Sequence, residues 1–139
     1  MAARYFQQFQ GVLEKGVVTL YANIPIGASG AVGTLTNSQN QGILSVVRNS
    51  AGNYTISFGN SAQGSIDKYV RLLDFSASVL LSSISVVSDI QVFNDNSSSG
   101  NIIIQVVAPT ATANTAGAAT DPDNGAVILL AITLKNASI

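Results

Sequence analysis

The chain has 139 residues, of which 47% are hydrophobic and 9% are charged, and its formal net charge is -1. This length fits one domain, and the charged fraction lies far below the roughly 25% of an average soluble protein. The sequence contains no His and no Cys, which excludes a Cys/His zinc site, a disulfide framework, a cysteine nucleophile and histidine acid–base chemistry, and its few scattered Lys and Arg argue against nucleic acid as a partner.

The first fifteen residues predict an arm that precedes a single β domain at residues 16–139. They carry aromatic side chains without a strand pattern, and we interpret Tyr5, Phe6 and Phe9 as candidate assembly contacts to another subunit. The segment lacks the apolar core and cleavage site of a signal peptide, so we expect synthesis in the cytoplasm without export. The most apolar stretches, 79–87 and 126–134, are too short to span a bilayer, so we expect no membrane partner.

Short runs of β-branched residues, separated by Gly, Asn, Ser and Pro, predict strands along the rest of the chain. Residues 16–24 form the first run, and a Gly-rich connection then leads to a short strand expected near residues 32–36. The clearest unit is a hairpin, in which residues 43–48 and 54–58 flank a four- or five-residue loop at 49–53. Its second arm alternates apolar with hydroxyl side chains, which predicts one buried face made of Tyr54, Ile56 and Phe58.

The second half of the chain continues this pattern. Residues 69–87 partly fit a helix, but their β-branched residues and serines favour strands. Residues 84–93 and 101–108 predict a second hairpin around 94–100, followed by an Ala/Thr-rich loop at 109–120. A tight turn at 121–125 and a closing strand at 126–135 complete the chain. These seven or eight strands predict an all-β fold, namely a single antiparallel β-sandwich or barrel.

The carboxylates do not form a catalytic pattern. A glycosidase needs two carboxyl groups that face each other across a sugar. Glu14 is the only Glu, and Asp121 and Asp123 fall in the predicted turn, where Asp commonly bonds the backbone. A calcium loop starting at Asp121 fails because its Gly is at the fifth position and Ile132 replaces the Glu at the twelfth.

The hydroxyl and amine side chains give no better pattern. Ser29 lacks the sequence of a nucleophile elbow and has no His to activate it. A Ser–Lys dyad with Lys68 or Lys135 has no support from spacing. We therefore expect no enzyme, no metal site and no cofactor. A small domain with so few charges instead predicts a subunit that buries its uncharged surface against other subunits.

The chain resembles the small, Cys-free, all-β decoration (cement) proteins on the capsids of tailed bacteriophages. The resemblance spans the whole chain and is carried by the Gly-rich segment 26–36, the hairpin at 43–58, and the tail from Asp121-Pro122-Asp123-Asn124-Gly125 to Ile139. It implies a structural virion protein that binds the major capsid protein from outside, self-associates as a homotrimer, and is made in the cytoplasm of the host.

A second function is compatible with the same residues. The Asn/Ser-rich loops at 94–100 and 37–42 also suit a head-fibre or adhesion module that contacts a receptor glycan. Tyr5 and Tyr21 are compatible with stacking on sugars, although core or interface packing is the default interpretation.

Overall fold

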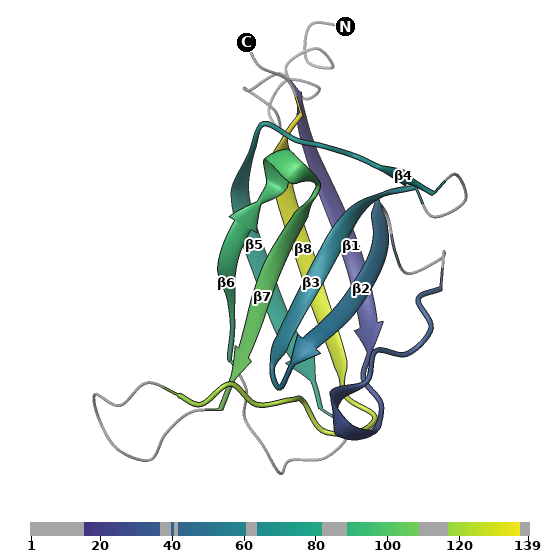
Figure 1. Ribbon diagram of the computed structural model, residues 1–139, viewed down its shortest axis with the longest axis vertical. Coiled ribbons are helices and arrows are strands. Elements are labelled where there is room, and N and C mark those ends of the chain that lie inside the picture. The colour runs from purple at the N-terminus through teal and green to yellow at the C-terminus, as the bar shows by residue number, and fades with distance from the viewer. Residues whose placement is uncertain are drawn as a thin grey trace, which may run out of the picture.

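The computed structural model describes residues 16–36, 40, 42–60, 64–81, 89–108 and 117–136. Within these residues eight strands form two antiparallel sheets, which confirms the expected all-β sandwich (Figure 1). The strands are β1 Val17–Pro25, β2 Ile43–Ser50, β3 Asn53–Asn60, β4 Ser65–Ile66, β5 Arg71–Leu80, β6 Asp89–Asn96, β7 Asn101–Val107 and β8 Val127–Lys135. Two single-turn 3-10 helices, η1 (Ala28–Gly30) and η2 (Ser97–Ser99), connect them.

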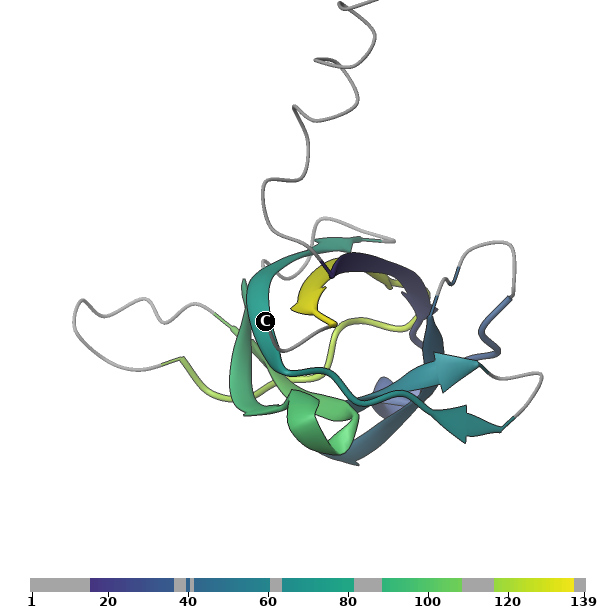
Figure 2. The ribbon, with the colours of Figure 1, turned by 90° about the horizontal axis from the view of Figure 1, so that it is seen from above.

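The two sheets differ in size and close around one core. The smaller sheet has the order β1–β8–β5, and the larger has the order β2–β3–β7–β6, with β4 paired to the end of β3. Strand β5 also lies against β6, and β1 lies against β2, so the strands surround the interior when viewed along their length (Figure 2).

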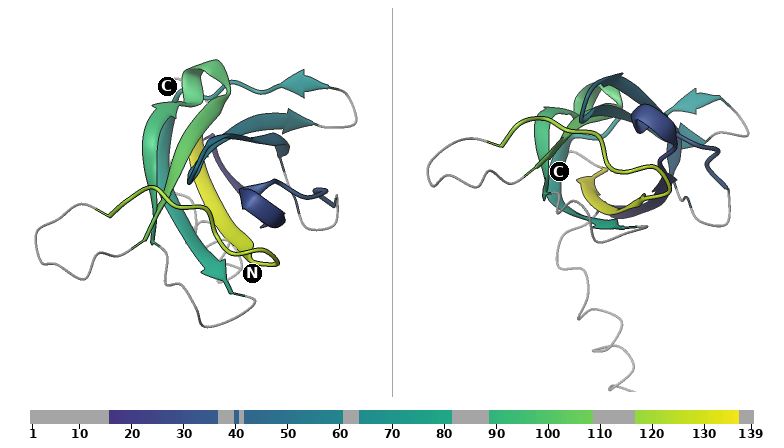
Figure 3. Two further views of the ribbon diagram at one scale, coloured as in Figure 1. Left: turned by 60° about the horizontal axis from the view of Figure 1, so that its bottom comes forward. Right: turned by 90° about the horizontal axis from the view of Figure 1, so that it is seen from below.

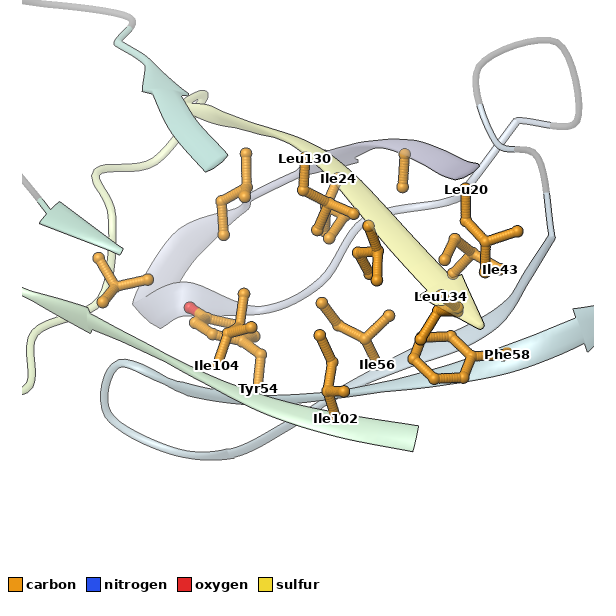
Figure 4. Close-up of a cluster of buried hydrophobic side chains, with 14 of the residues drawn as sticks. Leu20, Ile24, Ile43, Tyr54, Ile56, Phe58, Ile102, Ile104, Leu130 and Leu134 are labelled. Carbon is orange, nitrogen blue, oxygen red and sulfur yellow. The ribbon is translucent and has the colours of Figure 1, made fainter. Parts of the chain in front are cut away.

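The core is made by the inward residues of both sheets, which face one another in Figure 4. The expected apolar face of the first hairpin is confirmed, since Tyr54, Ile56 and Phe58 are all fully buried. Phe58 also meets Tyr69 edge to face, with ring centroids 5.5 Å apart. From the opposite sheet, β8 contributes four inward side chains: Ile128, Leu130, Ile132 and Leu134.

Both hairpins are confirmed, but their loops are shorter than the sequence predicts. In the first, strand pairing continues through Ser50 and Asn53, so only Ala51 and Gly52 form the turn. In the second, β6 extends to Asn96 and the connection is η2 with Gly100, while residues 84–88 of the expected strand lie outside the described residues. Polar residues at the loop edges join the ladders because backbone pairing does not depend on side-chain polarity.

Some expectations for the segments that connect the main strands need correction. Residues 32–36 form no strand; Val32 makes a single bridge to Ile26, and the Gly33 amide folds back to the Pro25 carbonyl. The short strand β4 has no signal in the sequence. The turn near Gly125 is confirmed, but the Ala126 amide bonds to the Asp123 carbonyl, which places Pro122 before the turn instead of inside it.

The remaining strand predictions agree with the structure where it describes them. The ambiguous region 69–87 contains strand β5, which confirms the strand interpretation for Arg71–Leu80, and residues 82–87 lie outside the described residues. The closing strand is confirmed as β8, which pairs with β1 on one side and with β5 on the other. Strand β8 is therefore the central strand of the smaller sheet.

Candidate functional site

The outward side chains of β1, β8 and β5 form one broad surface, which we call the three-stranded face. They alternate with the core residues along each strand, and the strand register sets them in rows. Three successive rows are Tyr21–Ala131–Ser76, Asn23–Leu129–Ser78 and Pro25–Val127–Leu80. None of these nine side chains is charged, so the middle and one end of the face are neutral.

Charge enters the three-stranded face only at its other end. There Lys135 pairs across the sheet with Val17 and Arg71, and the next row contains Thr19, Thr133 and Asp74. The two threonine hydroxyls of that row are 3.3 Å apart and share a hydrogen bond. The face is therefore neutral over most of its length and has a charged boundary where β1 begins.

A shallow hollow lies at the centre of the three-stranded face. It is lined by Tyr21, Asn23, Ser76, Ser78, Leu129 and Ala131. Ala131 forms its floor in the central strand, between Ser76 and Tyr21, and the Tyr21 ring is 53% exposed. A small residue between larger neighbours leaves room for an apolar side chain that comes from outside this sheet.

The outward side of β2, β3, β7 and β6, which we call the five-stranded face, is chemically different. Its rows contain hydroxyl and amide side chains, several of which bond to each other. The Asn49 amide donates to the Thr55 hydroxyl at 2.7 Å, and the Gln91 amide donates to the Gln105 oxygen at 3.2 Å. This ladder gives a polar surface, which carries the exposed carboxylate of Asp89 at the start of β6.

Two large apolar side chains interrupt the five-stranded face. Val47 of β2 is 54% exposed and Phe93 of β6 is 64% exposed. Phe93 is the extra residue of a β-bulge, because Val92 pairs with Ile104 while Asn94 already pairs with Ile103. Bulges turn a side chain away from the regular alternation, and here the bulge presents an aromatic ring to solvent at the edge of the sheet.

A cluster of hydrogen-bonded polar groups surrounds Asp121. Its carboxylate accepts two hydrogen bonds from the Arg48 guanidinium, at 2.9 and 2.7 Å, and one from the Gly52 amide at 2.9 Å. The Tyr54 hydroxyl lies 3.0 Å from the same carboxylate and 3.1 Å from the Gly30 carbonyl. The cluster joins the first hairpin, η1 and the segment before β8, which crosses the lower end of the sandwich in Figure 3.

The electrostatics of this cluster indicate a structural role. We call its members Asp121, Arg48, Gly52, Tyr54 and Gly30 the clasp. The hydrogen bond from Arg48, aided by the Gly52 amide, holds the pKa of Asp121 below its usual value, so the carboxyl stays ionised. Burial, followed by the contact with Asp121, raises the pKa of the Tyr54 hydroxyl, so this group stays protonated. A carboxylate with a lowered pKa, whose oxygens already accept hydrogen bonds from Arg48, Gly52 and Tyr54, is a weak base toward any other group.

The other candidates from the sequence do not come together. Tyr5, Phe6, Phe9 and Glu14 lie outside the described residues. Ser29 is exposed in η1, and Asp123 serves the turn through its backbone carbonyl. A second shallow hollow beside β4 contains Asp67 and Lys68. Within the described ranges, no group of three acidic residues is placed to hold a metal ion.

Sequence reasoning misses both Phe93 and the partners of Asp121. The run that contains Phe93 reads as a regular strand, and nothing in it marks the bulge. The sequence indicates only local backbone bonding for Asp121, whereas its partners Arg48 and Tyr54 are 73 and 67 positions away in the chain. The local signal in the sequence for a structural role of Asp121 is its place beside Pro122, with Asp123 on the other side of the proline.

Searches of protein-family models, of curated proteins and of solved structures found no match to this chain. In the part of the chain that the structure describes, no helix has the length and apolar character to cross a membrane. The functional argument therefore rests on the two sheet faces and their low charge.

Proposed function

We propose that this protein is a structural component of a tailed-phage virion that binds the outer surface of the capsid and stabilises the shell, without enzymatic activity. The observation that carries the proposal is the low charge of both sheet faces, each of which exposes large apolar side chains away from its few charged residues. Interface cores are depleted in charged residues and enriched in aromatic ones. Tyr21 and Phe93, one on each face, fit that composition.

We assign the contact with the capsid shell to the five-stranded face. Phe93 and Val47 supply its apolar anchors, while the Gln91–Gln105 and Asn49–Thr55 pairs offer hydrogen-bonding groups around them. An anchor surrounded by polar groups that exclude water is the usual arrangement at an interface hot spot. Self-association as a trimer would let each particle-bound unit attach at several points, which raises avidity without a new type of contact.

The stabilising effect is mechanical. A protein that binds the assembled shell but not its separated subunits shifts the equilibrium toward the assembled state, by an amount set by its concentration and affinity. Because the contacts are uncharged, this stabilisation should depend little on ionic strength. No reaction at the surface is required.

A second function, adhesion to a receptor glycan, is favoured by one specific observation. The five-stranded face carries the exposed Phe93 ring and the Gln91–Gln105 amide pair on the same two strands, β6 and β7, and an aromatic ring with amides is a combination that suits a neutral sugar. This alternative uses the same face as the shell contact. The two functions nevertheless differ in what they predict for particles that lack the protein.

Particles assembled with and without the protein test the proposal. If it decorates the shell, particles without it should rupture at lower temperature or under milder osmotic shock, while their adsorption to host cells stays unchanged. Loss of adsorption with unchanged rupture would favour the adhesion function instead. If both properties stay unchanged, the structural proposal is wrong.

A further inference from the structure

We propose that the three-stranded face is the docking site for residues 1–15 of a second copy of this chain, with an aromatic side chain of that segment seated in the hollow over Ala131. The inference deepens the proposed function, on which it rests, by identifying how copies hold one another. All residues of the receptor surface are described by the structure, and the occupant is identified by its reach and chemistry.

The receptor is neutral where a partner would be most buried. The hollow has an Ala131 floor, the half-exposed Tyr21 ring on one side and Ser76 on the other. The row on one side, Pro25–Val127–Leu80, is neutral, and the row on the other side contains one charged residue, Asp74, on the outer strand β5. An aromatic ring that enters the hollow meets a methyl group and the Tyr21 ring, and it leaves no buried charge unpaired.

The size of the face argues against rigid packing of two sandwiches through it alone. Three strands of about nine residues cover about 14 Å by 30 Å, or roughly 400 Å², at the usual spacing and rise of β-strands. A stable interface buries about 800 Å² on each partner. A second sandwich laid flat on this face would supply about half of that area.

An exchanged segment adds contact area between copies. A strand-like segment of about ten residues follows the same length of about 30 Å. At a strand spacing of about 4.8 Å it covers about a third of the width of the face, so each exchanged segment buries a strip of roughly 140 Å² on the face that receives it and a similar area of its own. In a ring of three copies, each copy likewise gives one segment and receives one.

The segment 1–15 has the position and composition for this role. It enters β1, the edge strand of the same sheet, at Gly16, whose carbonyl bonds the Asn136 amide beside the charged end of the face. Fifteen extended residues reach about 50 Å, which is enough to cross to a neighbouring copy and follow its face. The segment supplies three aromatic side chains, namely Tyr5, Phe6 and Phe9.

Cysteine cross-linking tests the contact directly, because the natural chain contains no Cys. Two full-length variants with different tags, Phe6→Cys and Ala131→Cys, are co-expressed and treated with a short bismaleimide. The matched control replaces Ala131→Cys by Ser57→Cys, which lies on the five-stranded face. We expect a linked product that contains both tags, in several-fold higher yield than with the control.

Three results would overturn the inference. Yield no higher than the Ser57→Cys control would show that the segment does not reach the hollow. The double variant F6C/A131C giving mainly an internally linked monomer would place the segment on its own chain. Efficient linking of Ala131→Cys to itself would indicate face-to-face packing of two copies.

A charge in the hollow gives a second readout. Ala131→Arg should convert the oligomer to monomer in light scattering while the β circular-dichroism spectrum is retained, whereas Ser57→Arg should leave the oligomer intact. A persistent A131R oligomer would contradict the docking site. Because neither assay contains capsids, cross-linking without shell stabilisation would refute only the proposed function, and shell stabilisation without cross-linking would refute only this inference.

Discussion

Asp121 connects three parts of the chain that are distant in sequence. Its carboxylate holds the Arg48 guanidinium of β2 and the Gly52 amide of the hairpin turn, and it lies beside the buried Tyr54 hydroxyl. The neighbouring Gly30 has no room for a side chain, because a Cβ there would collide with the Asp121 carboxyl group. The clasp therefore fixes the lower end of the sandwich and leaves the two faces free for binding.

Removal of this carboxylate should destabilise the fold. In Asp121→Ala the Tyr54 hydroxyl keeps the Gly30 carbonyl as an acceptor, but the buried Gly52 amide loses its side-chain partner. An unsatisfied buried amide costs about 1–3 kcal/mol, and this loss should appear as a lower urea midpoint. Asp67→Ala, at an exposed position, is the matched control and should unfold like the parent chain. Equal midpoints for the two variants would show that the clasp contributes no stability.

The same group predicts a pH dependence of stability. Because Arg48 and the Gly52 amide depress the pKa of Asp121 below its ordinary 3.8 in the folded protein, its contribution is fully present above that value. It is lost as the pH falls through the depressed pKa, since protonation then favours the unfolded chain. Urea midpoints measured between about pH 6 and pH 2 should therefore decrease more steeply for the parent than for Asp121→Asn. Parallel curves would contradict this linkage.

At the scale of elements, the β2–β3 turn depends on Gly52. Its φ is +69°, and a Cβ at this position would lie 2.6 Å from both the Thr120 amide nitrogen and the Val106 carbonyl oxygen. The Val106 amide also donates to the Gly52 carbonyl. The turn is thus wedged between β7 and the segment that carries Asp121, which explains why it is shorter than a typical polar loop.

Substitution of Gly52 should lower the free energy of unfolding by more than its left-handed backbone conformation alone would explain. Gly64 has a similar φ of +61°, but a Cβ there would have no atom within 4 Å, so Gly64→Ala should lose only the left-handed backbone term, about 1 kcal/mol. Gly52→Ala adds the collision with fixed backbone atoms and should be clearly less stable in the same urea titration. Similar stabilities for the two variants would mean that the turn can move away from Thr120.

The elements are predictable from the sequence to the extent that their signals are local. Alternation in residues 54–58 identifies the buried side of β3, β-branched residues identify β1 and β8, and the serines at positions 76 and 78 favour a strand over a helix in β5. The bulge at Phe93 and the length of the first turn are not predictable, since both depend on the register with β7 and on contacts with the segment 117–121. The Arg48–Asp121 pair joins positions 73 residues apart, a separation at which one sequence carries no pairing signal.

At the scale of the whole molecule, the charge-poor surface predicts a stable homo-oligomer. Light scattering at micromolar concentration should give a mass above that of the 14.3 kDa chain, with a trimer expected. Because neutral contacts are insensitive to screening, the mass should be the same in low and high salt. A monomer under these conditions would contradict self-association, and dissociation at high salt would contradict its uncharged character.

The exposed aromatic of the five-stranded face should matter for attachment but not for folding. Phe93 is 64% exposed, so Phe93→Ser removes little buried surface and should leave the thermal midpoint nearly unchanged. It should weaken binding to capsid shells by tenfold or more, as expected for an interface anchor worth about 1.4 kcal/mol or more. Ile66→Ser, at a similarly exposed position on β4, is the control and should bind like the parent.

Sedimentation of the purified chain with capsid shells assembled without it tests the central claim most directly. We predict that the protein pellets with the shells in a saturable manner, that binding is nearly the same in low and high salt, and that free shell subunits do not compete. If the protein stays in the supernatant at concentrations well above those at which it self-associates, or if it binds separated subunits as well as shells, the proposed role as a capsid-stabilising protein is wrong.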